Sequence, residues 1–126
     1  LVPMSIEKQK QFILLIDDNS AVREALVWAL EYAEYFTVAV QDGQEALNIL
    51  EKDPLPVVIF LDLMMPVLDG FEFREKKKLC QRISNIPTII TSAKTNLEKM
   101  EKMPYETFLP KPFDLNELFH ILKKIL

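Results

Sequence analysis

The run Val57-Val58-Ile59-Phe60-Leu61-Asp62, which Leu63-Met64-Met65-Pro66 follows, is the starting point for predicting the fold. Five consecutive apolar residues, rich in Val and Ile, predict a strand that is buried on both faces, as in the centre of a parallel sheet. The run ends in a carboxylate, and open α/β sheets bind ligands at the carboxyl ends of their strands. Asp62 therefore lies where a functional site is expected, although an Asp at a strand end can also serve only to begin a turn.

Composition limits the classes of protein to consider. The chain has 126 residues, of which 49% are hydrophobic and 27% charged, typical of one globular domain. Its formal net charge of −4 argues against nucleic acid as a direct partner. Cys80 is the only cysteine, so we expect a reducing, cytoplasmic compartment. No apolar run is long enough to span a membrane, and no signal peptide is recognisable.

Short apolar runs alternate with helical patterns along the chain. We predict an N-terminal extension over residues 1–10, with 1–3 left over from expression, and one domain over residues 11–126. Strands are expected at 11–16, 36–40, 57–62, 87–91 and 105–109, and helices after Asn19 or Ser20, near 46–50, and at 71–82, 95–103 and 114–125. This (βα)5 alternation predicts a doubly wound α/β domain, with helices on both faces of a five-stranded parallel sheet.

Polar side chains follow the apolar strands. Asp17 and Asp18 follow the first strand, Asp62 the third, Ser92 the fourth and Lys111 the fifth. We expect them to gather, because the carboxyl ends of parallel strands share one edge of the sheet. Three neighbouring carboxylates repel one another unless a cation lies between them, and Mg²⁺ prefers oxygen ligands. Together with a lysine and a hydroxyl, they favour phosphoryl transfer, with the Asp62 carboxylate as the nucleophile.

The order and spacing of these motifs resemble the receiver domain of two-component response regulators, including chemotaxis regulators. The resemblance covers residues 11–125 and rests on Asp17-Asp18-Asn19, Asp42-Gly43-Gln44-Glu45-Ala46-Leu47, Asp62 to Pro66 with Asp69-Gly70, Ser92-Ala93, and Lys111-Pro112-Phe113. It implies a flavodoxin-like fold with strand order 2-1-3-4-5.

The resemblance also implies a role for each site residue. Asp62 would accept a phosphoryl group from a histidine kinase or a histidine phosphotransfer protein. The implied ligands of Mg²⁺ are Asp17, Asp18, Asp62 and the main-chain carbonyl of Met64. Lys111 and Ser92 would contact the phosphoryl group, and Ser92 and Phe108 would form the switch.

Two positions depart from the family pattern. Met64 stands where a polar residue is common, and Met103-Pro104 where Gly-Ala often precedes the fifth strand. We expect the first to slow self-dephosphorylation, because a methionine side chain is apolar and flexible. The output surface is expected at 95–103, 105–109 and 114–125, where an effector or a second copy of the chain would dock.

Three alternatives remain at this stage. A pseudo-receiver would keep the fold as an interaction scaffold without phosphorylation. A phosphohydrolase with an Asp nucleophile would want a second Asp at position 64, which is Met. A flavodoxin-like cofactor binder would want a glycine-rich first loop, and residues 17–25 contain no glycine. The favoured interpretation is therefore a signalling phosphoacceptor that promotes its own phosphorylation and dephosphorylation, rather than an enzyme.

Several residues also have ordinary structural interpretations. Asp17, Asp18 and Asn19 can serve only to cap a helix, and Ser92 and Lys111 can be turn residues. We expect Lys76-Lys77-Lys78 to form a solvated helix face, and Cys80 to be half-buried in packing. Trp28 and Tyr32 are expected to cover the flank of the first helix, with a partner contact as the alternative.

Overall fold

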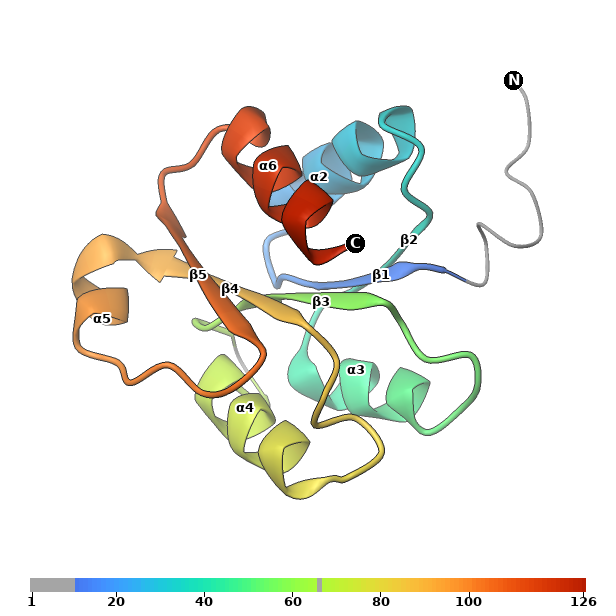
Figure 1. Ribbon diagram of the computed structural model, residues 1–126, viewed down its shortest axis with the longest axis vertical. Coiled ribbons are helices and arrows are strands. Elements are labelled where there is room, and N and C mark those ends of the chain that lie inside the picture. The colour runs from blue at the N-terminus through green and yellow to red at the C-terminus, as the bar shows by residue number, and fades with distance from the viewer. Residues whose placement is uncertain (1–10, 66) are drawn as a thin grey trace.

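The computed structural model, shown in Figure 1, describes residues 11–65 and 67–126. The predicted extension over residues 1–10 and the motif residue Pro66 lie outside the described residues. The elements, in chain order, are β1 (Ile13–Ile16), α2 (Ser20–Tyr32), β2 (Thr37–Val40), α3 (Gly43–Leu50), β3 (Val58–Asp62), α4 (Gly70–Leu79), β4 (Thr88–Ala93), α5 (Lys94–Glu98), β5 (Glu106–Lys111) and α6 (Leu115–Ile125).

All five strands are parallel, and their order is β2-β1-β3-β4-β5. Helices α2 and α6 cover one face of the sheet, α3 and α4 cover the other, and α5 lies beside the β4 and β5 edge (Figure 1). The predicted doubly wound, flavodoxin-like fold is therefore confirmed. The crossover between β1 and β3 places β3 at the centre of the sheet, with β1 and β4 as its neighbours.

The core has two layers, because successive strand residues point to opposite faces of the sheet. Ile59 and Leu61 of β3 belong to the layer that packs against Phe73 of α4. Val58 and Phe60 belong to the other layer, which includes Leu26, Leu30, Leu118 and Leu122 of the covering helices. Since both faces are covered, a continuous apolar run is the pattern that this central strand requires.

Side-chain caps fix where most of the helices begin. Asn19 caps α2 by accepting a hydrogen bond from the backbone N–H of Val22 at 3.1 Å. Asp114 caps α6 and forms a capping box with Glu117. The helix predicted to start after Asn19 or Ser20 thus begins directly after Asn19. In α2, however, Trp28 is 77% and Tyr32 is 84% exposed, so the prediction that they cover its flank was wrong.

Helix α4 ends at Leu79, three residues before the predicted end at 82. The backbone at Cys80 is extended, and its carbonyl accepts hydrogen bonds from the N–H groups of Ile83 and Ser84 in a turn. Cys80 is exposed, so its predicted half-buried packing was wrong. Lys77 is buried, contrary to the predicted solvated face, because its Nζ donates to the carbonyl of Ser84 at 3.0 Å.

Helix α5 spans Lys94–Glu98, so it begins one residue before the predicted 95–103 and ends five residues earlier than predicted. Beyond it, tertiary partners occupy backbone groups that a longer helix would pair internally. Arg74 donates to the carbonyl of Glu101 at 3.0 Å, and Glu106 accepts from the N–H of Met103 at 2.8 Å. The predicted output surface therefore contains a short helix followed by an irregular segment.

None of the helices in the described part of the chain has both the length and the apolar character needed to cross a bilayer.

Candidate functional site

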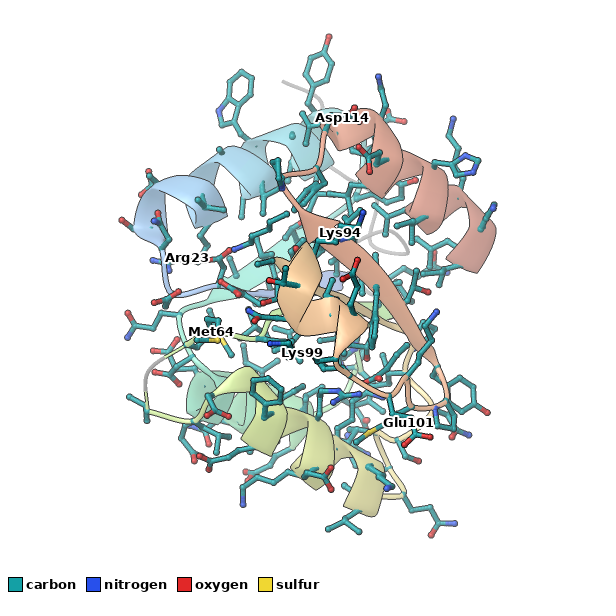
Figure 2. All side chains as sticks on the ribbon, turned by 90° about the vertical axis from the view of Figure 1, so that its left-hand side faces the viewer. Arg23, Met64, Lys94, Lys99, Glu101 and Asp114 are labelled. Atoms are coloured by element: carbon teal, nitrogen blue, oxygen red, sulfur yellow. The ribbon has the colours of Figure 1, made fainter. Side chains whose placement is uncertain are left out.

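Three carboxylates meet at the carboxyl edge of the sheet. Asp17 and Asp18 directly follow β1, and Asp62 is the last residue of β3. One oxygen from each of the three carboxylates lies within 4.8 Å of the others. Figure 2 looks onto this edge and shows Arg23, Met64 and Lys94 facing the viewer around it. The strand-end rule thus places the acids together, as expected from their positions in the sequence.

Asp17 is the most buried member of the cluster, with only 1% of its surface exposed. Its Oδ1 accepts the N–H of Asn19 at 2.9 Å, whereas its Oδ2 has no hydrogen-bond partner among the described residues. Burial raises the pKa of the Asp17 carboxyl above its usual value; the Asn19 N–H opposes this shift, and the charge of Asp62 adds to it. A buried acceptor without a donor, surrounded by negative charge, is suited to a cation.

Asp62 lies between a backbone donor and a lysine. Its Oδ1 accepts the N–H of Met64 at 3.1 Å, and its Oδ2 lies 3.3 Å from Nζ of Lys111. Lys111 is the last residue of β5, so this contact depends on both strands ending at the same edge. The site therefore combines a buried carboxylate, one flexible positive charge and two further acids.

The predicted switch residues, Ser92 and Phe108, lie on β4 and β5, which are neighbours in the sheet. Ser92 is 2% exposed, and its Oγ accepts a hydrogen bond from Nδ2 of Asn96 at 3.0 Å. Phe108 is half-buried against the core layer that also contains Leu97. Nζ of Lys102 lies 5.3 Å from the centroid of the Phe108 ring, which is within the range of a cation–π contact.

The profile of the family described as "Response regulator receiver domain" matches residues 13–123. The chain belongs to this family. Among curated proteins, it is similar to "Response regulator MprA" of Mycolicibacterium vanbaalenii, with 34% identity over 121 residues that make up 90% of this chain and 49% of that protein. The receiver domain described here thus spans about half the length of the curated relatives it matches.

Solved structures agree with this assignment. The chemotaxis response regulator CheY4 of Vibrio cholerae is similar with a TM-score of 0.81 and 28% identity, over 92% of this chain and 98% of that one. The receiver domain of the sensor histidine kinase PA1611 from Pseudomonas aeruginosa has a TM-score of 0.79 and 27% identity, over 90% and 95% of the two chains. That structure is described as having a magnesium ion coordinated in the active site cleft.

In this receiver domain, two glycines hold the loop that follows Asp62. The N–H of Gly70 donates to the carbonyl of Leu63 at 2.9 Å, and the N–H of Gly43 donates to that of Leu68 at 3.3 Å. A Cβ at Gly70 would lie 2.4 Å from Cα of Leu63, so a side chain would displace the loop. These are the two glycines of the chain, and both allow a helix to approach this loop closely.

Met64, in the loop that follows Asp62, lies beside the acidic cluster, and 62% of the Met64 surface is exposed. Val67 in the same loop has φ of 66°, a left-handed conformation that a β-branched residue rarely adopts. Such backbone strain persists only where the surrounding structure imposes it. The loop next to Asp62 is therefore shaped by tertiary contacts rather than by local preference.

Sequence reasoning missed two residues at the receiver site. Nη1 of Arg23 donates to the carbonyl of Asp17 at 2.7 Å and so fixes the backbone between β1 and α2. A positive charge close to a helix N-terminus is unfavourable for the macrodipole, and this was the available signal that Arg23 has another partner. Asn96 was missed because nothing in its spacing indicates a hydrogen bond to Ser92.

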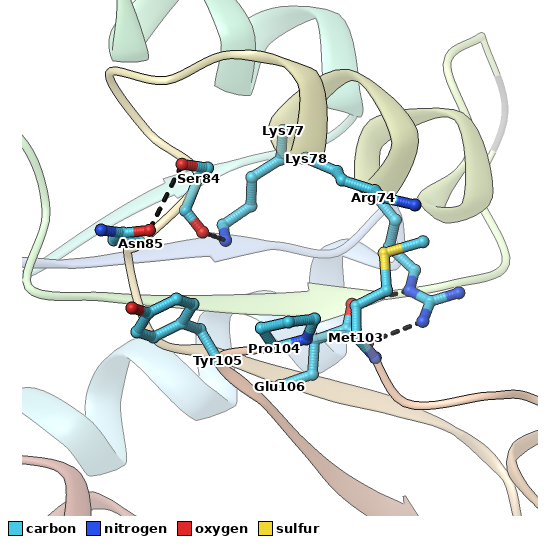
Figure 3. Close-up of a pocket in the computed structure, with 9 residues that line it drawn as sticks. All are labelled: Arg74, Lys77, Lys78, Ser84, Asn85, Met103, Pro104, Tyr105 and Glu106. Atoms are coloured by element: carbon cyan, nitrogen blue, oxygen red, sulfur yellow. Dashed lines mark hydrogen bonds and ion pairs between the residues drawn. The ribbon is translucent and has the colours of Figure 1, made fainter.

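A separate pocket of about 230 Å³ lies near the opposite edge of the sheet, between α4 and the start of β5. Figure 3 shows Arg74, Lys77 and Glu106 in its wall. Arg74 and Glu106 form a buried bidentate pair, with N–O distances of 2.6 and 2.7 Å. Because Glu106 begins β5 and Lys111 ends it, this pocket is distinct from the acidic cluster.

Proposed function

We propose that Asp62 is the phosphoacceptor of this receiver domain and that a histidine kinase or histidine phosphotransfer protein supplies the phosphoryl group. The single observation that best supports this is the buried Oδ2 of Asp17, which has no hydrogen-bond donor among residues 11–65 and 67–126 and lies beside two more carboxylates. A carboxylate that only caps a helix does not require a buried oxygen without a donor, because such an oxygen is destabilising. A phosphoryl-transfer site that binds a cation does require such an oxygen, as a ligand of the cation.

The donor set fits Mg²⁺, which binds proteins through carboxylates, carbonyl oxygens and water. Asp17, Asp18, Asp62 and the carbonyl of Met64 would hold the ion. When bound, it would offset the negative charge of the carboxylates and of the incoming phosphoryl group.

In the transfer step, a carboxylate oxygen of Asp62 forms a bond to phosphorus, while the bond from phosphorus to the donor's histidine nitrogen breaks. That nitrogen keeps the electron pair of the broken bond. The Lys111 ammonium lies close enough to Asp62 to neutralise charge on the equatorial oxygens. The Ser92 hydroxyl then donates to one of these oxygens. Hydrolysis of the acyl phosphate by water restores Asp62, so the domain acts as a timed phosphoacceptor rather than as a conventional enzyme.

The output would pass through α5, β5 and α6 to an effector or to a second copy of the chain. Added phosphoryl charge draws Ser92 inward, and Phe108 on the neighbouring strand turns into the space beneath the loop after β4. As a phenylalanine, Phe108 has no hydroxyl to leave unsatisfied when buried. Phosphorylation thereby shifts the population between two packings of the α5 region.

The proposal is tested by incubating the protein with acetyl phosphate and Mg²⁺ and measuring its intact mass. The wild type should gain one phosphoryl group, and Asp62→Asn should gain none. Asp114→Asn is the matched control, because asparagine caps a helix as well as aspartate does, and it should label like the wild type. Equal labelling of Asp62→Asn and the wild type would refute the assignment.

A further inference from the structure

The switch hydroxyl has a partner that belongs to the helix it is expected to move. Asn96 lies in α5, and its Nδ2 donates to Oγ of Ser92 at 3.0 Å. Ser92 belongs to β4, the strand directly before that helix. One side-chain hydrogen bond thus joins Ser92, near the end of β4, to Asn96, the third residue of α5. The two residues are four positions apart in the chain.

Helix α5 has little else to fix its orientation. It has five residues, and its N-cap residue Ala93 makes no side-chain capping hydrogen bond. Its ion pair between Lys94 and Glu98 is exposed, with an N–O distance of 3.9 Å, and such pairs contribute little. Leu97 is buried and anchors the helix to the core. The Asn96 bond to Ser92 therefore makes a substantial contribution to how α5 sits against β4.

We propose that Asn96 is a positioning residue that holds the Ser92 hydroxyl in its resting place and links its movement to α5. This inference rests on the proposed phosphorylation of Asp62. Ser92 Oγ reaches a phosphoryl group on Asp62 by changing rotamer, and a rotamer change moves Oγ away from Nδ2 of Asn96. On phosphorylation, the Ser92 hydroxyl then gives up its hydrogen bond to the neutral Asn96 amide and forms one to a charged phosphoryl oxygen. This removes the side-chain hydrogen bond between β4 and α5.

Asn96 could restrain the resting Ser92 hydroxyl or assist its bond to the phosphoryl group. The direction in which beryllofluoride affinity changes when the Asn96 side chain is removed distinguishes these two roles. If Asn96 restrains the resting Ser92, its removal favours the activated state. If Asn96 instead keeps its bond and polarises the hydroxyl toward the phosphoryl group, its removal disfavours that state. Beryllofluoride with Mg²⁺ is a stable mimic of the phosphoryl group and reports the affinity for the activated state.

We expect Asn96→Ala to bind beryllofluoride about two- to tenfold more tightly than the wild type, as the loss of one resting-state hydrogen bond predicts. In the Ser92→Ala background the same substitution should have no effect, because the bond is already absent. Asn116→Ala, an exposed asparagine of α6, is the matched control and should leave the affinity unchanged in both backgrounds. A purely structural role of Asn96 would not depend on Ser92.

Hydrogen exchange gives a second readout that does not require the double variant. Beryllofluoride should change exchange at residues 94–98 in the wild type, and this change should shrink in Asn96→Ala. Unchanged or weaker beryllofluoride binding by Asn96→Ala, or an equal effect with and without Ser92, would overturn the inference. If the wild type binds no beryllofluoride in the presence of Mg²⁺, the proposed phosphorylation of Asp62 is refuted, and the role of Asn96 that depends on it is refuted as well.

Discussion

Lys111 and Asp62 lie 49 residues apart in the chain, and yet their side chains meet, with Nζ of Lys111 3.3 Å from Oδ2 of Asp62. Only β4 separates the two strands that carry them. Asp62 is almost fully buried, whereas 41% of the Lys111 side chain is exposed. The Lys111 side chain therefore has room to change conformation, whereas the Asp62 carboxylate is enclosed by the protein.

This geometry predicts that Lys111 transmits the signal but is not needed for the cation. Lys111→Ala should retain Mg²⁺ binding in calorimetric titrations, because all three carboxylates remain. It should lose the change in hydrogen exchange over residues 92–110 that beryllofluoride produces in the wild type. Lys94→Ala, an exposed lysine at the same edge, should keep both responses. Loss of Mg²⁺ binding in Lys111→Ala would contradict the division of roles.

Met64 is expected to control how long the phosphoryl group survives. Its exposed side chain lies beside the site, and its sulfur offers at most a weak hydrogen-bond acceptor to the attacking water. Met64→Asn should therefore speed self-dephosphorylation, measured as the decay of the phosphorylated mass after removal of donor. Met64→Leu is the apolar control and should decay as slowly as the wild type. An unchanged half-life in Met64→Asn would exclude this side chain as the control.

The buried pair of Arg74 and Glu106 should be a major determinant of stability. Arg74→Met leaves the Glu106 carboxylate buried without its cation, which costs about 3–5 kcal/mol in comparable cases. Urea unfolding should show this loss, and Arg74→Met/Glu106→Leu should recover much of it. The exposed pair of Arg82 and Asp53 is the control, because the ion pair that Arg82→Met removes is worth only about 1 kcal/mol or less. Similar losses for Arg74→Met and Arg82→Met would contradict the burial argument.

Lys77 predicts a specific dependence of stability on pH. Burial lowers the pKa of Lys77 below its usual 10.5, and the charge of Glu106 only partly opposes this. Between the lowered folded-state pKa and 10.5, the unfolded chain binds more protons than the folded chain, so this group's contribution to stability increases with pH. The free energy of unfolding of the wild type should therefore rise relative to Lys77→Met as the pH increases toward 10.5.

The matched comparison for this effect is Lys76→Met, since Lys76 is the exposed neighbour of Lys77 on the same helix. Its difference from the wild type should stay constant over the same pH range. Parallel pH profiles for the wild type and Lys77→Met would show that burial does not perturb this amine.

The sheet and the acidic cluster were predictable because two simple rules apply to them. A strand covered on both faces needs a continuous apolar run, and parallel strands end at one shared edge. Asp17, Asp62 and Lys111 each follow such a run, so their proximity followed from the strand assignments. Their distances required the structure, as did the finding that Oδ2 of Asp17 has no hydrogen-bond partner in the part of the chain that is described.

The parts that sequence analysis missed depend on tertiary partners. Helix α5 ends early where Arg74 and Glu106 take up the backbone groups of residues 101 and 103. Lys77 has charged neighbours on both sides in the sequence, and only the turn after α4 supplies the carbonyl of Ser84 that buries it. Local periodicity cannot report either contact, because the partners lie in other elements.

The central claim is that chemistry at Asp62 changes the surface formed by α5 and β5. Hydrogen exchange of the wild type with Mg²⁺, with and without beryllofluoride, tests it most directly. We predict that the largest change in protection outside the site itself falls in residues 92–110. A change confined to residues 17–25 and 62–70 would contradict the account, because the output would then be read directly at the phosphorylation loop.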